Sequence, residues 1–129
     1  MTEEFVTLET AKLLKEKGFK EDVFTFYEVD CVEGDMILSE TYDESENFNE
    51  KNDCLSAPTQ SLAQKWLRET KNIHICVYNC ACGYGYEISK ADNGTHITSS
   101  VYEGTNDGGE WDTYEEALES GLQEALKLI

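Results

Sequence analysis

The chain has 129 residues, a length typical of one domain, and 40% of them are hydrophobic, which is enough for one ordinary core. Its 27 acidic residues outnumber 10 basic ones, and the formal net charge of -17 argues against binding to nucleic-acid phosphates. No apolar run is long enough to cross a bilayer, and the N-terminus lacks a signal-peptide pattern. The five cysteines, an odd number, indicate reduced thiols. We therefore expect a single cytoplasmic domain over residues 1–129.

The first predicted element is a helix from Thr7 to Lys17. Thr7 is a typical N-cap residue, because its hydroxyl can accept a free backbone N–H of the first turn. Gly18 supplies the left-handed position that commonly ends a helix, and Phe19 is expected to pack back on the last turn. The apolar face comprises Leu8, Ala11 and Leu14.

Two strands and a loop are predicted next. Residues 23–29 are rich in β-formers, and Met36-Ile37-Leu38 is expected to pair with them across a turn at Glu33-Gly34-Asp35. The stretch from Glu40 to Asp53 is acidic and rich in asparagine, so we expect a long solvated loop. The only candidate anchors in it are Tyr42 and Phe48.

A second helix is predicted to begin at Ser56-Ala57-Pro58, because a capping residue precedes a proline whose missing N–H costs nothing in the first turn. Apolar residues then recur with helical spacing, while Lys65, Arg68 and Lys71 are expected to face solvent. The apolar stripe comprises Thr59, Leu62, Ala63, Trp66, Leu67 and Thr70.

The middle of the chain predicts a sheet with one buried and one polar face. Apolar and polar residues alternate from Ile73 to Tyr78, and Asn93-Gly94 favours a two-residue hairpin loop. We expect His96 on the polar face, where His74 and Cys76 also belong. In this register the opposed pairs are Asp92 and Thr95, Lys90 and Ile97, Ile88 and Ser99, and Tyr86 and Val101.

The last helix is predicted from a capping box, Thr113-x-x-Glu116, and continues to Ile129. Its apolar side includes Gly121. Since glycine in a helix costs about 1 kcal/mol relative to alanine, this residue indicates close approach of another element. Leucine at position 121 is expected to overpack the core and destabilise the fold by about 1 to 3 kcal/mol, and alanine to be milder or slightly stabilising through its helix propensity. The order α-β-β-α-β-β-β-α predicts an α+β fold of two layers, with three helices on one face of an antiparallel sheet.

We predict no catalytic, cofactor-binding or metal-binding residues. Cys76, Cys80 and Cys82 with His74 suggest a metal cluster, but on a strand they project side by side, whereas zinc needs converging ligands. A cysteine paired with His74 or His96 could serve as a nucleophile and its base, yet the acidic surroundings disfavour a thiolate. Inert thiols, with no metal and no cofactor, are therefore expected.

Three other patterns are rejected. Gly83-x-Gly85 resembles the start of a dinucleotide fingerprint, but Ile88 stands where the third glycine belongs. Residues 107–112 lack the alternating oxygen ligands of a calcium loop. Residues 56–129 have the element order of a double-stranded-RNA-binding domain, with acidic residues where that domain places cations.

Residues 57–69, followed by Asn72-Ile73-His74-Ile75, resemble a group of small uncharacterised proteins from gut anaerobic bacteria and their prophages. Residues 9–19 and 112–129 are similar to the same group, so the likeness spans nearly the whole chain, and its most specific part is Ala-Pro-Thr-Gln at 57–60. The group has no assigned activity. Residues 76–86 and the Asn93-Gly94 turn depart from it.

Three function classes remain. The leading hypothesis is a non-enzymatic accessory protein that binds another protein through the polar sheet face or through the loop from Glu40 to Asp53, and that is phage-derived. The alternatives are an acidic mimic of nucleic acid that occupies a DNA-binding host protein, and a cysteine/histidine enzyme. An interaction protein is expected to expose an apolar patch, a mimic a continuous acidic surface, and an enzyme a concave polar pocket.

Overall fold

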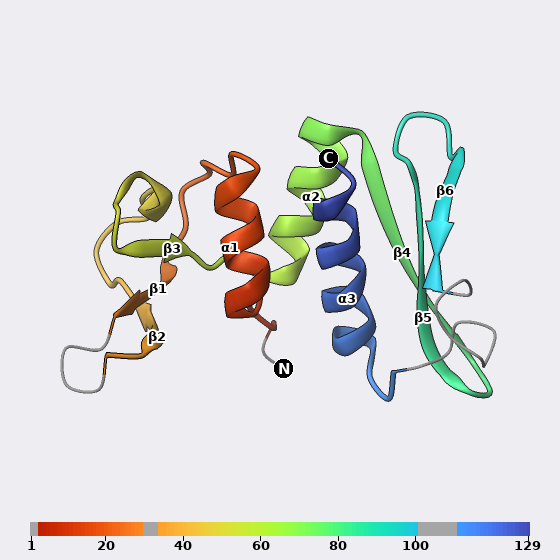
Figure 1. Cartoon of the computed structure of the whole chain (residues 1–129), viewed down its shortest axis with the longest axis horizontal. Helices are drawn as coiled ribbons and strands as arrows, with labels where there is room; N and C mark the ends of the chain where they lie inside the picture. Colours follow the sequence, from red (N-terminus) through yellow and green to blue (C-terminus); the bar gives the residue numbers. More distant parts are fainter. Residues whose placement is uncertain (1–2, 30–33, 101–110) are drawn as a thin grey trace. The chain divides into compact units, whose positions relative to one another are not determined.

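The computed structural model describes residues 3–29, 34–100 and 111–129 (Figure 1). The chain forms two compact units, Met1–Thr59 and Gln60–Ile129. Several predictions involve residues outside the described ranges, namely Cys31, Glu33, Val101 and 107–110. That residues 1–129 form one domain stays a prediction.

Helix α1 (Leu8–Glu16) begins and ends where its capping residues predict. The Thr7 hydroxyl accepts the N–H of Thr10, and Gly18 has a φ of 89°. The N–H of Phe19 donates to the carbonyl of Leu14 at 2.9 Å, and the Phe19 side chain is buried. These bonds satisfy backbone groups that the helix ends leave free, so the predicted caps are confirmed.

The first unit also contains a three-stranded antiparallel sheet in the order β2-β1-β3. The predicted pairing of the first two strands is confirmed, with Val29 opposite Met36. The third strand was not predicted, and α1 packs against it. The strands are β1 (Thr25–Val29), β2 (Met36–Glu40) and β3 (Cys54–Ser56).

The loop between β2 and β3 is more structured than predicted. Its second half contains a 3-10 helix, η1 (Phe48–Glu50), whose first residue is only 3% exposed. The Phe48 ring stacks on Phe26 with 4.1 Å between ring centroids. Tyr42, in contrast, is 90% exposed. Residues 50–53 are exposed, as expected of a solvated loop, whereas the candidate anchor Phe48 is buried and fixes η1 on the sheet.

The second unit places helices α2 and α3 on one antiparallel sheet of order β4-β5-β6. The α+β class and the predicted order of helices and long strands are confirmed. The strands form two sheets rather than one, because each strand pairs only with strands of its own unit. No described helix is long and apolar enough to span a membrane. The elements are α2 (Gln60–Lys71), β4 (Ile73–Cys80), β5 (Gly83–Lys90), β6 (His96–Ser99) and α3 (Tyr114–Lys127).

Helix α2 starts later than its cap signal predicted. Ser56 lies in β3 opposite Phe26, and the helix begins at Gln60. Pairing with β1 therefore outweighs the local preference of serine for an N-cap position. The helix buries Gln60, Ala63, Trp66 and Leu67, whereas Leu62 is half-buried and Thr70 is exposed.

The predicted register of the β5–β6 hairpin was wrong. The N–H of Lys90 donates to the carbonyl of Thr95 at 2.8 Å, so the hairpin closes through a longer loop than Asn93-Gly94 alone. A β-bulge between Ile88 and Ser89 then shifts the register. The observed opposed pairs are Glu87 and Ser99, Ile88 and Thr98, and Ser89 and His96.

Helix α3 confirms both the capping box and the close approach at its glycine. The Thr113 hydroxyl accepts the N–H of Glu116 at 3.1 Å. A Cβ atom on Gly121 would lie 2.9 Å from Cγ2 of Ile75 and 3.2 Å from Cγ of Tyr86. Glycine therefore allows the helix to lie directly on β4 and β5. The buried face comprises Ala117, Leu118, Gly121, Leu122, Ala125 and Leu126.

Candidate functional site

The polar face of the second sheet holds the residues of the predicted cysteine/histidine alternative. His74, Ser89 and His96 oppose one another across the three strands, and Cys76 opposes Glu87 in the neighbouring row. The prediction that His96 shares a face with His74 and Cys76 is confirmed, because the bulge keeps His96 on that side. This face could be reached by a ligand, since Cys76, Glu87 and His96 are exposed.

The geometry of this face does not assemble a nucleophile. The residue directly opposite Cys76 is a carboxylate, and Oε2 of Glu87 lies 3.7 Å from Nδ1 of His96. Within the described ranges no hydrogen bond joins a cysteine to a histidine; the Cys76 thiol contacts the carbonyl of Val77 at 4.0 Å. A thiol nucleophile needs a base within hydrogen-bond reach. The face is therefore a polar surface on which the Glu87 carboxylate lies beside His96.

The other described cysteines also form no hydrogen bond with a histidine within the described residues. Cys80 and Cys82 lie exposed at the β4–β5 turn, and the Cys80 thiol donates to the carbonyl of Gly83 at 3.4 Å. Nowhere in the described chain do three His, Cys, Asp or Glu side chains come together as metal ligands. Cys54 is buried in β3. Burial, and then the carboxylate of Asp53, raise the pKa of the Cys54 thiol.

A different surface, which the sequence did not single out, lies along strand β2. This strand is at one edge of its sheet. The N–H of Thr41 donates to the carbonyl of Phe24, and antiparallel pairs alternate, so the backbone groups of residues 37 and 39 face β1. Those of residues 36, 38 and 40 face outward. No other described strand pairs with them.

The side chains beside this open edge are unusually apolar for exposed positions. Ile37 is 40% exposed and Leu38 is 46% exposed. Val29 and Tyr42 are exposed as well. We call the outer backbone of β2 together with these four side chains the edge surface.

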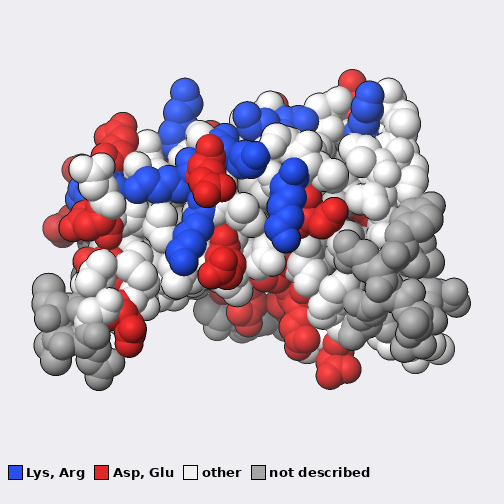
Figure 2. Space-filling view, in the orientation of Figure 1, with Lys and Arg blue, Asp and Glu red and all other residues white. Residues whose placement is uncertain are grey.

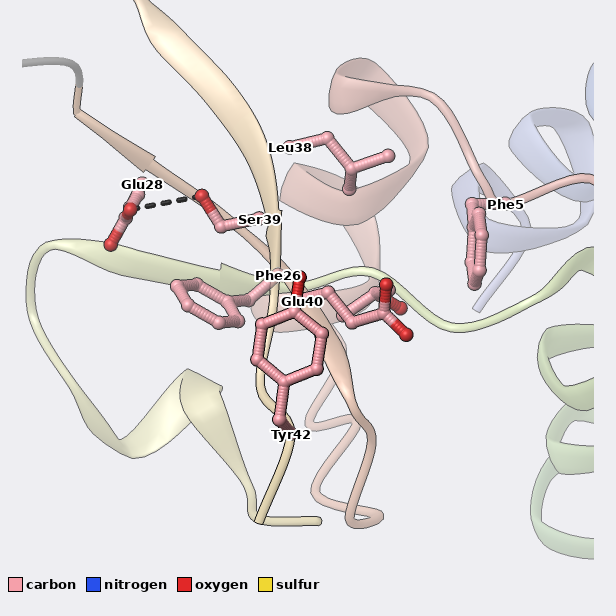
Figure 3. Close-up of a pocket in the computed structure, with 8 residues that line it drawn as sticks. Phe5, Phe26, Glu28, Leu38, Ser39, Glu40 and Tyr42 are labelled. Atoms are coloured by element: carbon pink, nitrogen blue, oxygen red, sulfur yellow. Dashed lines mark hydrogen bonds between the residues drawn. The ribbon is translucent and has the colours of Figure 1, made fainter. Parts of the chain in front are cut away.

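A pocket of about 590 Å³ adjoins the edge surface (Figure 3). It combines aromatic rings with two carboxylates, those of Glu28 and Glu40. The Glu28 carboxylate accepts a hydrogen bond from the Ser39 hydroxyl at 2.9 Å, whereas the Glu40 carboxylate points toward Phe5. Glu40 is exposed and Glu28 is half-buried. The lining comprises Phe5, Thr25, Phe26, Glu28, Leu38, Ser39, Glu40 and Tyr42.

The segment that carries this surface is strongly acidic. Residues 21–50 include eleven aspartates and glutamates and neither lysine nor arginine. The basic residues of the first unit belong to α1, to the segment just after it, and to Lys51. Figure 2 shows acidic side chains on the part of this unit that holds β1 and β2, and lysine side chains over α1. The edge surface is therefore an apolar strip in an acidic field.

We compared the chain with protein-family models, with curated protein sequences and with solved structures, and none of them matches. The sequence contained one signal for the second surface, which is the coincidence of Met36-Ile37-Leu38 with the stretch that lacks basic residues.

Proposed function

We propose that the chain is a protein-interaction module that binds its partner through the edge surface, and that it is not an enzyme. One observation carries this proposal: an edge strand whose outer backbone groups pair with no other described strand also exposes large apolar side chains, Ile37 and Leu38. Natural proteins usually protect such edges with charges, prolines or a covering segment. An edge that is left open and apolar is a typical place for a partner to bind.

The proposed binding surface differs from the two that the sequence suggested, the polar sheet face and the loop from Glu40 to Asp53. On the polar sheet face, Oε2 of Glu87 lies 3.7 Å from Nδ1 of His96, and the other residues in the row of His96 are His74 and Ser89. The loop from Glu40 to Asp53 contributes through its first residues, because Glu40 and Tyr42 line the pocket. Farther along the same loop, Phe48 fixes η1 on the sheet.

Site-specific photocrosslinking tests the proposal. Tyr42 is replaced by p-benzoyl-phenylalanine in cells that naturally contain the protein, and a matched variant carries the same group at the exposed Tyr114 of α3. We expect a discrete crosslinked protein from position 42 and none of the same mass from position 114. Leu38→Lys should abolish the adduct, since a charge on the strip opposes burial.

The comparison of crosslinks from positions 42 and 114 decides between the outcomes. Identical adducts from positions 42 and 114, or no adduct from position 42, would remove support for the edge surface as the binding site. An adduct with the mass of two copies of this chain would still support an interaction module, with a second copy as the partner.

A further inference from the structure

We propose that the edge surface binds an extended basic segment of a partner protein, which adds to β2 as a fourth strand and places a lysine or arginine in the adjoining pocket. This inference rests on the proposed function and names the chemistry of the partner.

The backbone argument sets the shape of the partner. Residues 36, 38 and 40 present three N–H groups and three carbonyls in one row, with the spacing that an extended chain needs. A helix cannot satisfy such a row, because its own backbone groups are already paired. Addition of a strand satisfies both chains at once, and this is a common mode of peptide recognition.

The pocket sets the chemistry of the partner's side chains. A cationic side chain there would meet the carboxylate of Glu40, and its alkyl stem would lie against aromatic rings such as Phe5 and Tyr42. Aromatic faces attract cations, and long basic side chains bury their stems readily. An acidic side chain there would instead be repelled by the Glu40 carboxylate. Because side chains alternate along a strand, basic residues at every second position can follow the pocket side.

The negative charge of the chain disfavours a second copy as the partner bound at the edge surface. Two chains of formal charge -17 would bring their acidic 21–50 segments together at this edge. Like charges brought together in this way oppose association. A basic segment gains from the same field, which speeds its approach and weakens as salt is added.

The test uses the full chain and a synthetic nine-residue peptide that alternates lysine and valine. Amide hydrogen exchange is measured by NMR with and without the peptide. We expect the amides of Met36, Leu38 and Glu40 to gain protection, about tenfold when free peptide is about ten times its Kd. The amides of Ile37 and Ser39 already face β1 and should change little. This alternating pattern is specific to strand addition.

Matched peptides and variants complete the design. A glutamate/valine peptide, and a lysine/valine peptide with a central proline, should not protect these amides, because one has the wrong charge and the other cannot pair. Glu40→Lys should weaken binding of the lysine/valine peptide at least about tenfold, which corresponds to about 1.4 kcal/mol. Glu69→Lys makes the same charge change at an exposed position of α2 and should weaken binding much less.

Three results would overturn the inference. The first is equal binding of the proline-containing peptide without protection at positions 36, 38 and 40, since this would mean binding by charge alone, as in a nucleic-acid mimic. The second is protection of these amides in the free protein that rises with its concentration, since this would make a second copy the occupant. The third is absence of binding by the lysine/valine peptide. A crosslink from position 42 would in every case still support the interaction function.

Discussion

Replacement of Gly121 by alanine tests how closely α3 lies on its sheet. In an open helix, alanine would stabilise the protein by about 1 kcal/mol relative to glycine. Here the new Cβ would lie 2.9 Å from Cγ2 of Ile75 and 3.2 Å from Cγ of Tyr86, and both side chains are buried in the sheet. Overpacking of this kind costs about 1 to 3 kcal/mol. The structure thus revises the expectation that alanine is mild.

Two fixed neighbours place the overpacking cost in the upper part of that range, so we expect Gly121→Ala to lower the free energy of unfolding by about 1 to 2 kcal/mol. Gly121→Leu should lower it further. The measurement is urea denaturation followed by circular dichroism, with the slope of the transition checked for a constant value.

Two variants of Ile75, combined with Gly121→Ala, test whether the contact with Ile75 causes the loss of stability. Ile75→Ala removes Cγ2, whereas Ile75→Val keeps it and removes only the terminal methyl. The cost of Gly121→Ala should fall toward zero or reverse in the Ile75→Ala background and stay unchanged with Ile75→Val. A stabilising effect of Gly121→Ala in the otherwise unchanged protein would refute the reasoning, because α3 would then lie farther from β4 than the structure places it.

The remaining predictions concern three single residues, Cys54, Asn72 and Thr113. The Cys54 thiol should react with a maleimide far more slowly than the exposed thiols of β4 and the β4–β5 turn, because it is buried and its pKa is raised. Because the pKa of the Cys54 thiol is higher in the folded than in the unfolded chain, the neutral thiol favours folding at pH values below the ordinary thiol pKa. This contribution to the free energy of unfolding should be lost as the pH rises through the thiol pKa of the folded protein, and denaturation measured at several pH values would show the loss. Asn72 has a φ of 58°, and its side chain accepts the N–H of Asp92. Asn72→Ala should therefore lower the stability by about 1 to 2 kcal/mol in thermal unfolding. Asn72→Gly should cost less, because glycine adopts this φ without strain. Thr113→Ala should cost about 1 kcal/mol in the same assay and Thr113→Ser much less, since serine keeps the oxygen that accepts the N–H of Glu116.

The features that the sequence predicted well depend on a few adjacent residues. The caps at Thr7 and Thr113 and the glycine end at Gly18 use hydrogen bonds or dihedral angles within one helical turn. Such signals do not need the rest of the fold to be known. The same holds for the alternation from Ile73 onward, which marked the buried side of β4.

The features that the sequence missed depend on distant partners. Ser56 has the chemistry of an N-cap, but its backbone is used to pair with β1, which lies about thirty residues earlier in the chain. The bulge at Ile88 cannot be read from the hairpin sequence, because it reflects how β6 fits beside β5. Both errors come from tertiary contacts that outweigh local preference.

The edge surface was missed for a related reason. Met36-Ile37-Leu38 is uniformly apolar, so its pattern indicates a buried strand as readily as an exposed one. Only the strand order shows that β2 is at an edge, and that order arises because β3 returns to the other side of β1. The acidic composition of the surrounding residues could be read from the sequence, but not the surface that it surrounds.

The order of strands in the two sheets also bears on how quickly each can form. In the second sheet every pair joins strands that are neighbours in the chain, β4 with β5 and β5 with β6, and the first of these reverses direction over only two residues, Ala81 and Cys82. Contacts between residues close in sequence need little loop closure, and hairpins form in about 1 to 10 μs.

In the first sheet, β3 must cross the span that includes η1 before it reaches β1. Closure of that longer loop loses more chain entropy before any pairing is gained. We therefore expect the β1–β2 hairpin to form before the β1–β3 pair during folding. Until β3 arrives, both edges of that hairpin lack a neighbouring strand, and no strand of the described residues covers the outer edge of β2 in the native fold.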